Sequence, residues 1–466
     1  MRRPVKNRFP LAVVVALAVS AIAPVAVQAR GNDRPAPPVS SEFAVESQRL
    51  ADGLVNAVTT AGFNDLVDYS NRIDDVAQPI AALPNIDVAV IELDSDGEIV
   101  GAANVLFDRD KPNGHQVQID PQSLQASGVT FTQWRTNRWD SQSLWDAGPA
   151  AGDVLAGDDA DVEFMVPYPA SVLKLMVGYS IMRLVDDGQI TLKTKHTYRR
   201  IGGRGCEVDR RKEKVADWMD EMITISSNGA TCALLQLIND LAQLDAANAH
   251  FAELGLDTLR MYPAQPDVGA TWLAAPARMT MGALDTAKLT LLLAGSQDQL
   301  WSDPDGNPVT EDVLSASSRD FLRGLLAEQG FHEVLSTGLL CGSPDTVAGI
   351  PAPVPEQFID RKSGHGVVDG IDFGYDVRPC NEAAEVTFAH KTGLISVSGN
   401  DTGIVRALPG EDGRWYVVSI HTSVGYRFGD AAWARSTPDA CSSAPFVCYP
   451  PAFATVGAAI DALIID

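Results

Sequence analysis

Blocks of hydrophobic and polar residues along the chain predict its first elements. Between residues 44 and 82, apolar side chains recur at helical spacing, which predicts one or two amphipathic helices. Residues 86–93 are rich in β-branched side chains and, with residues 98–104, predict a β-hairpin around an Asp-Ser-Asp-Gly turn. Residues 105–160 follow no regular pattern and are long for a loop, so we expect small elements of their own there.

A nearly all-apolar stretch begins at Pro169 and runs to about Asp187, where Gly188 ends it, and this pattern predicts a buried helix. Further helices are expected at 213–223, 229–244, 283–295 and 312–329, strands at 384–390, 402–408 and 414–422, and a last helix at 450–465. Because strands lie near both ends and helices between them, we expect an α/β (α+β) fold. An antiparallel sheet would be assembled from both ends, flanked by helices, with an all-α lobe inserted.

The N-terminal residues follow the plan of an export signal. Four basic residues precede an apolar run from Leu11 to Val27, and Val27-Gln28-Ala29 offers small side chains for cleavage after Ala29. The run is at the short end for a membrane anchor, and no cysteine follows it to accept a lipid. We therefore expect a secreted or periplasmic/extracellular protein without membrane insertion after cleavage.

Shifts in composition divide the chain into parts. The expected parts are a signal peptide at 1–29, a polar, Pro-rich linker at 30–43, an α/β lobe formed by 44–104 and 383–466, an insertion at 105–160, a mostly helical lobe at 161–340 and a loop insertion at 341–382.

Composition and charge bound the partners. Apolar residues make up 45% of the chain, enough for large cores, and the formal net charge of −24 leaves no basic footprint for nucleic acid. The six cysteines of an exported chain predict at least two disulfides. A Cys341–Cys380 disulfide would cross-link the predicted loop at 341–382, and Cys441 and Cys448 are close enough in sequence to pair. We expect a monomer. No metal or cofactor is expected, because no C-x-x-C, Walker A or G-x-G-x-x-G motif occurs.

The first of three candidate motifs is Ser171-Val172-Leu173-Lys174, at the start of the predicted buried helix. Residues i and i+3 share one helix face, so Lys174 is expected beside the Ser171 hydroxyl. A lysine in a dry pocket loses its proton readily and can serve as the base that a serine nucleophile needs. The alternative is a helix-start serine and a solvated lysine, but a lone lysine inside an apolar run argues against it.

The second motif is Ser226-Ser227-Asn228, directly before another apolar helix, and the third is Lys391-Thr392-Gly393, at the end of a predicted strand. Taken alone, the second is an ordinary helix cap and the third a strand that stops at glycine. In this order, S-x-x-K, S-x-N and K-T-G resemble the signature of class A β-lactamases and penicillin-binding proteins. The zinc-protease pattern H-E-x-x-H begins at His332 but is broken by Ser336.

The resemblance covers residues 44–104 and 161–466 and implies a β-lactamase/transpeptidase-like fold with the site between its lobes. It implies that Ser171 is the nucleophile and Lys174 its base, with Ser226 as a proton relay that Lys391 supports. Asn228 and Thr392 would bind the substrate. The backbone N–H groups of Ser171 and of Leu394, which follows Gly393, would form the oxyanion hole.

The implied activity is that of an active-site-serine hydrolase, which forms an acyl-enzyme on a β-lactam or a related amide. One alternative is a D-alanyl-D-alanine carboxypeptidase or penicillin-binding protein acting on peptidoglycan stem peptides. Another is a non-catalytic penicillin- or wall-binding module.

Two positions depart from the family pattern. Ser227 stands where the family usually has Asp. Class A β-lactamases also carry a Glu-x-x-Leu-Asn loop after the second motif, whereas residues 259–269 contain no Glu and have Asp267 as their only carboxylate. Without a base to activate water, an acyl-enzyme is expected to persist, as in penicillin-binding proteins.

Overall fold

The structure is a computed structural model, and it describes residues 41–157, 160–199, 210–262, 279–296, 299–343, 347–411, 413–430 and 450–465. The signal peptide, Asp267 and the cysteines at 206, 441 and 448 lie outside these ranges, so what the sequence predicts for them stays a prediction. None of the helices in the described ranges combines the length and the apolar character that a membrane crossing requires.

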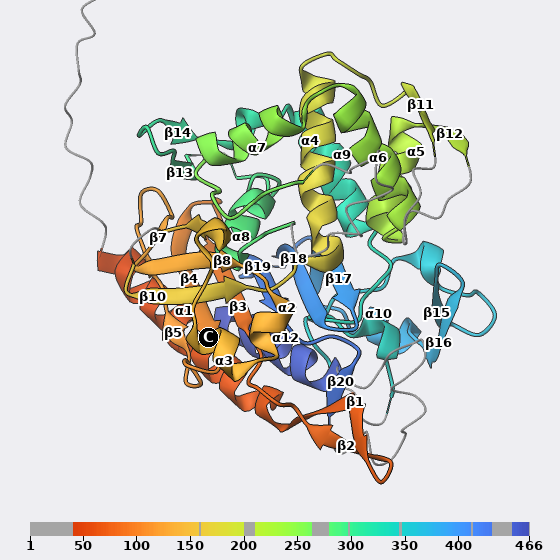
Figure 1. The fold of residues 1–466 in the computed structure, drawn as a ribbon. Coiled ribbons are helices and arrows are strands. Elements are labelled where there is room, and N and C mark those ends of the chain that lie inside the picture. Colours follow the sequence, from red (N-terminus) through yellow and green to blue (C-terminus); the bar gives the residue numbers. More distant parts are fainter. Residues whose placement is uncertain are drawn as a thin grey trace, which may run out of the picture. The chain divides into compact units, whose positions relative to one another are not determined.

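A six-stranded antiparallel sheet carries the fold, in the order β17-β18-β19-β3-β4-β5 (Figure 1). The strands are β17 (Val386–Ile395), β18 (Ser398–Ala407), β19 (Trp415–Thr422), β3 (Ile86–Leu93), β4 (Ile99–Phe107) and β5 (His115–Gln116). Strand β19, from the C-terminal part, pairs with β3, from the N-terminal part. The prediction of a sheet assembled from both ends of the chain is therefore confirmed.

Helices cover both faces of this sheet and form a second, helical lobe. The helices are α1 (Ser41–Thr60), α4 (Lys174–Asp186), α5 (Val215–Thr224), α6 (Asn228–Asp240), α7 (Leu244–Glu253), α8 (Ala283–Leu291), α9 (Ala316–Ala327) and α12 (Pro450–Ile465). On β18, Gly399 faces Phe453 of α12, whereas Thr402 meets Thr290 of α8 with 3.1 Å between their hydroxyl oxygens. Successive strand residues alternate in direction, so α12 and α8 lie on opposite faces.

Helix α4 lies within the helical lobe, packed against α5, α6 and α9 (Figure 1). A 3₁₀ turn, η3 (Ala170–Leu173), leads into it, and Gly188 follows its end at φ 70°. Leu175 and Tyr179 have no exposed surface. The predicted buried helix is confirmed, with its first turn tightened to 3₁₀.

Residues 105–160 contain small elements, as their length suggested. Strand β8 (Val129–Gln133) pairs in parallel with β10 (Val162–Val166) and in antiparallel with β9 (Val154–Ala156). Two short helices, α2 (Thr136–Trp139) and α3 (Gln142–Asp146), follow β8. Phe131 and Phe164 belong to a small core of their own in this region.

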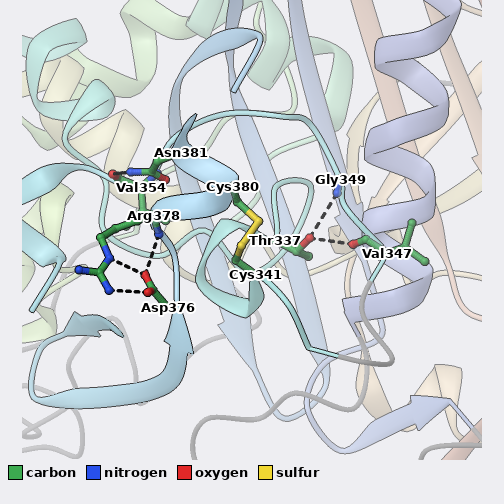
Figure 2. The surroundings of a disulfide bond; sticks show 9 residues. All are labelled: Thr337, Cys341, Val347, Gly349, Val354, Asp376, Arg378, Cys380 and Asn381. Atoms are coloured by element: carbon green, nitrogen blue, oxygen red, sulfur yellow. Dashed lines mark hydrogen bonds and ion pairs between the residues drawn. A yellow bond between two sulfur atoms is a disulfide. The ribbon is translucent and has the colours of Figure 1, made fainter. Parts of the chain in front are cut away.

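The stretch read as a loop at 341–382 also carries structure. It contains the hairpin of β15 (His365–Val368) and β16 (Ile371–Asp376) and the short helix α10 (Arg378–Glu382), around a separate hydrophobic core. Cys341 and Cys380 form a disulfide with their Cα atoms 5.9 Å apart, which confirms the predicted pairing (Figure 2). Cys232 is also disulfide-bonded.

The prediction of helix throughout residues 44–82 is wrong for its second part. Helix α1 ends at Thr60, and a hairpin of β1 (Leu66–Ile73) and β2 (Val76–Pro79) follows. Gly62 takes a left-handed conformation at φ 83°, which carries the chain out of the helix, and Asp74 and Asp75 turn the hairpin with φ of 50° and 63°.

Candidate active site

The Ser171 hydroxyl and the Lys174 amine lie together at the start of α4. Lys174 Nζ is 2.8 Å from Ser171 Oγ, and the lysine has no exposed surface while the serine is partly exposed. Burial lowers the pKa of Lys174 well below its ordinary value, and the nearby charge of Lys391 lowers it further. Ala170, directly before the serine, is held at φ 46°, a strained conformation of the kind that is concentrated at functional sites.

Lys174 also joins the first motif to the second. Its Nζ donates to the Ser226 carbonyl at 2.6 Å and to Asn228 Oδ1 at 3.1 Å, and it lies 2.9 Å from Ser226 Oγ. Ser226 itself is left-handed at φ 55°, which turns both its carbonyl and its hydroxyl toward the lysine. The motif is thus held in an unusual backbone conformation rather than in an ordinary helical turn.

The backbone around Ser226 is fixed from both sides. Before it, the end of α5 is capped, because Gln329 Nε2 donates to the Ile223 carbonyl at 2.8 Å. After it, Ser227 Oγ accepts the Ala230 N–H at 3.2 Å and caps α6. The serine that replaces the family's Asp therefore retains a structural role.

Lys391 approaches the same serine from the sheet. Its Nζ donates to Ser226 Oγ at 3.0 Å and to the Thr392 carbonyl at 2.9 Å. Burial lowers the pKa of Lys391 to about 7, although the charges of Asp401 and Glu333 raise it and offset part of that effect. Ser226 Oγ thus lies between two buried lysines.

The third motif lies inside β17 rather than at its end, so that prediction is corrected. The strand continues to Ile395 and pairs with β18 through to Ser398, because a short turn reverses the chain there. Glycine is required at 393 for another reason: a Cβ there would lie 2.6 Å from the Pro169 carbonyl and 2.8 Å from Ser171 N. Gly393 lets the strand lie directly against the turn that carries Ser171.

One residue in this region escaped the sequence reading. Asn400 of β18 is fully buried, and its Nδ2 donates to the carbonyls of Tyr168 and Gly393, both at 3.2 Å. Its Oδ1 accepts the Thr422 N–H at 3.0 Å. Asn400 therefore ties the segment before Ser171 to the sheet.

The structure brings most of the predicted site residues together. Hydrogen bonds join Ser171, Lys174, Ser226, Asn228 and Lys391, and Gly393 is in contact with the serine turn. Thr392 and Leu394 are neighbours of Gly393 on β17, where they pair with Asp401 and Gly399. Within the described ranges, no three metal-ligating side chains converge on one point.

A family model described as "Beta-lactamase enzyme family" matches residues 163–436, more than half of the chain and all three motifs. The chain belongs to the β-lactamase enzyme family. No match was found among curated proteins.

Solved structures of β-lactamases and of PBP-A are similar to this family member. "Structure of PBP-A" is 17% identical over 81% of this chain and 88% of that chain, with a TM-score of 0.41. A β-lactamase from Sphaerobacter thermophilus is 14% identical over 88% and 95%, with a TM-score of 0.41. An ancestral class A β-lactamase is 16% identical over 89% and 98%, with a TM-score of 0.41.

Proposed function

We propose that the protein is an exported active-site-serine hydrolase that forms an acyl-enzyme on β-lactams or related amides. The observation that carries the proposal is the 2.8 Å contact between Ser171 Oγ and the fully buried amine of Lys174. A serine becomes a nucleophile when a neighbouring base takes its proton, and a lysine that is buried away from water and has a lowered pKa is such a base.

The hydrogen bonds around Lys174 suit a neutral amine. Such an amine has two N–H groups and one lone pair. The Ser226 carbonyl and Asn228 Oδ1 can only accept, so they take the two N–H groups. The lone pair is then left for a hydroxyl proton, and the two hydroxyls within reach are those of Ser171 at 2.8 Å and Ser226 at 2.9 Å. In the proposed step, Ser171 Oγ attacks the substrate carbonyl while its proton passes to Lys174 Nζ.

Ser226 is positioned to return the proton. Its Oγ contacts both Lys174 and Lys391, so a proton taken from Ser171 can pass through it to the leaving nitrogen. Lys391 supports this transfer with a local positive charge. Asn228 and Thr392 would bind the substrate, and the N–H groups of Ser171 and Leu394 would stabilise the oxyanion.

Deacylation is expected to be slow, because residues 259–269 contain no glutamate to activate water. The loss of a general base costs about 10²–10⁴-fold in rate, enough to make a hydrolase a near-stoichiometric penicillin binder. The missing glutamate is the observation that favours the second candidate, a D-alanyl-D-alanine carboxypeptidase or penicillin-binding protein. Export is supported by the Cys341–Cys380 disulfide, since such bonds persist in oxidising compartments.

Intact-protein mass spectrometry with benzylpenicillin, followed over time, tests the proposal. We expect rapid gain of one penicillin per chain and slow loss of the adduct. Fast, complete hydrolysis without a detectable adduct would show that an unrecognised base activates water. The absence of both adduct and hydrolysis would favour a non-catalytic wall-binding module.

A further inference from the structure

A chain of buried polar side chains lies behind Lys391, on the face of the sheet that carries His390 of β17 and Asp401 of β18. His390 Nδ1 is 2.9 Å from Asp401 Oδ1, and His390 Nε2 is 3.4 Å from Nε2 of His332. His332 Nδ1 is in turn 3.2 Å from Ser336 Oγ. None of these four side chains is more than 1% exposed. Such a set is costly to bury unless every member is hydrogen-bonded.

The positions of the protons in this chain follow from its two ends. Burial lowers the pKa of both histidines well below the ordinary value, so both rings are neutral and each carries one N–H. The contact between the two rings needs one proton, and an ionised Asp401 can only accept. With Asp401 ionised, the hydrogen bonds therefore run from Ser336 through His332 and His390 to Asp401, and the His332 ring also bonds the backbone of Gln329.

Asp401 has no cation in hydrogen-bond contact in this arrangement. Its second oxygen accepts the Leu335 N–H at 3.2 Å, so both of its oxygens are bonded to neutral donors. Burial raises the pKa of Asp401 to about 7, while the Leu335 N–H, the nearby His332, the charge of Lys391 and the Thr402 N–H lower it. The carboxylate and Lys391 thus influence each other across the strand.

The two lysines on Ser226 Oγ cannot easily both be charged in a dry pocket, because like charges at this range repel strongly. The charged groups near the two lysines differ in sign. Lys391 has Asp401 and Glu333 near it, which favour its protonated form. The only charged neighbour that shifts the pKa of Lys174 is Lys391, which opposes protonation.

We propose that Asp401, oriented by His390 and His332, is a positioning residue that holds the shared proton on Lys391 and so leaves Lys174 neutral. It acts through Lys391 and touches no substrate. The inference rests on the proposed function, because a neutral Lys174 matters only if it takes the proton of Ser171.

The segment that supplies His332 is anchored to the disulfide-bonded region. The Leu335 carbonyl accepts the Ile350 N–H at 2.8 Å. Thr337 then accepts the Gly349 N–H at 3.2 Å and donates to the Val347 carbonyl at 2.8 Å (Figure 2). This anchoring keeps His332 in place against His390.

The first test needs no activity. The full chain contains seven histidines, so ¹⁵N-histidine NMR can resolve their tautomers, with His332→Gln and His390→Gln assigning the two signals. We expect the Nδ1–H tautomer at His390 and the Nε2–H tautomer at His332. An Nε2–H tautomer at His390 would overturn the proposal even if the protein reacts with penicillin.

The second test compares Asp401→Asn with Asp87→Asn. Asp87 is a matched control: it is buried in the same sheet and also accepts one backbone N–H, from Ala283, and one side-chain N–H, from Asn104. The rate of acylation by a fluorescent penicillin is measured against pH. Loss of the Asp401 charge should make Lys391 release its proton more easily and move the alkaline limb down by about one pH unit. Asp87→Asn should leave the profile unchanged.

The outcomes separate the two proposals. An unchanged profile in Asp401→Asn overturns the role of Asp401 while the proposed function stands. If the wild-type protein shows no acylation, the proposed function fails, and the ¹³Cε shift of labelled lysine still reports whether Lys391 titrates at lower pH in Asp401→Asn. If that variant does not fold, the histidine tautomers of the wild-type protein decide the question.

Discussion

Strand β17 has two faces that share a backbone but differ in composition and in access to solvent. On the face toward the helical lobe, called the front face, Lys391 and Gly393 lie against the turn of Ser171, and Ser171 is partly exposed. On the opposite, rear face, His390 and Asp401 of the neighbouring strand β18 are buried, and a series of hydrogen bonds ends at the Asp401 carboxylate.

Groups of opposite charge lie on opposite faces of this part of the sheet. The front face gathers two amines whose pKa values are lowered, and the rear face contains the carboxylate that favours the proton on one of them. Within a poorly polarisable interior, such a carboxylate acts over a longer range than it would in water. Lys391 and the turn of Ser171 would carry out the proton transfer, and His390 and Asp401 would set the protonation of Lys391.

The largest expected effect comes from the front face. Ser171→Ala should abolish the penicillin adduct, because no other group would take its place as nucleophile. Mass spectrometry measures the yield, and circular dichroism checks the fold. Ser180→Ala is a matched control, since Ser180 lies on the same helix and only bonds the Met176 carbonyl. An undiminished adduct on Ser171→Ala would remove the serine from the mechanism.

Loss of the base should come next. Lys174→Ala should slow acylation about 10²–10⁴-fold, the usual contribution of a positioned base. Stopped-flow acylation with a chromogenic cephalosporin measures the rate. Lys288→Met is the control, because Lys288 is an equally buried lysine that bonds the Ser123 and Gly255 carbonyls away from Ser171. A wild-type rate in Lys174→Ala would make that lysine purely structural.

The close approach of strand and turn can be broken without changing a polar group. Gly393→Ala should reduce acylation about tenfold or more, because its Cβ would meet backbone atoms that must shift, and a small misplacement of a reacting group is costly. Gly324→Ala is the control, since a Cβ at that helical position meets nothing within 4 Å. Equal rates in the two variants would show that the turn tolerates displacement.

The two faces also differ in how far they could be predicted. The front face depends on short motifs, and one helical turn is enough to place Lys174 beside Ser171. The rear face is assembled from residues far apart in sequence, and only the fold brings His332 to His390. The sequence reading noticed His332 and Ser336 only as a failed zinc pattern, although the two side chains are in contact.

The same distinction, between contacts among neighbouring residues and contacts between distant ones, explains which helices and strands were predicted correctly and which were not. Helix α4 and the hairpin of β3 and β4 follow from local periodicity. The hairpin of β1 and β2 was misread as helix because it is stabilised partly by pairing with β20 (Phe428–Asp430), far along the chain. The end of β17 was also misplaced, because its last residues remain in the sheet by pairing with β18.

The segment that supplies His332 to the rear face is anchored to the region of the Cys341–Cys380 disulfide, and removing this bond should weaken that region. The double variant Cys341→Ser, Cys380→Ser should lower the free energy of unfolding by about 2–4 kcal/mol, because it removes a cross-link that restricts the unfolded chain. Urea unfolding measures the change. The acylation rate at neutral pH should change much less than in Gly393→Ala. An unaltered unfolding midpoint would show that the separate core of this region suffices without the bond.

The smallest effect concerns a buried carboxylate that is not coupled to the lysines. Burial raises the pKa of Asp87 to about 6, above its ordinary value. Between about pH 4 and 6 the folded chain therefore holds a proton that the unfolded chain has released. For this group, the free energy of unfolding increases as pH falls through that range and is lowest above it, where Asp87 is buried in its charged form. Asn at this position cannot titrate, so the difference in unfolding free energy between wild type and Asp87→Asn should change by about 2–3 kcal/mol between pH 4 and 7. Urea unfolding at several pH values measures it, and a difference that stays constant with pH would mean that folding does not shift the pKa of Asp87.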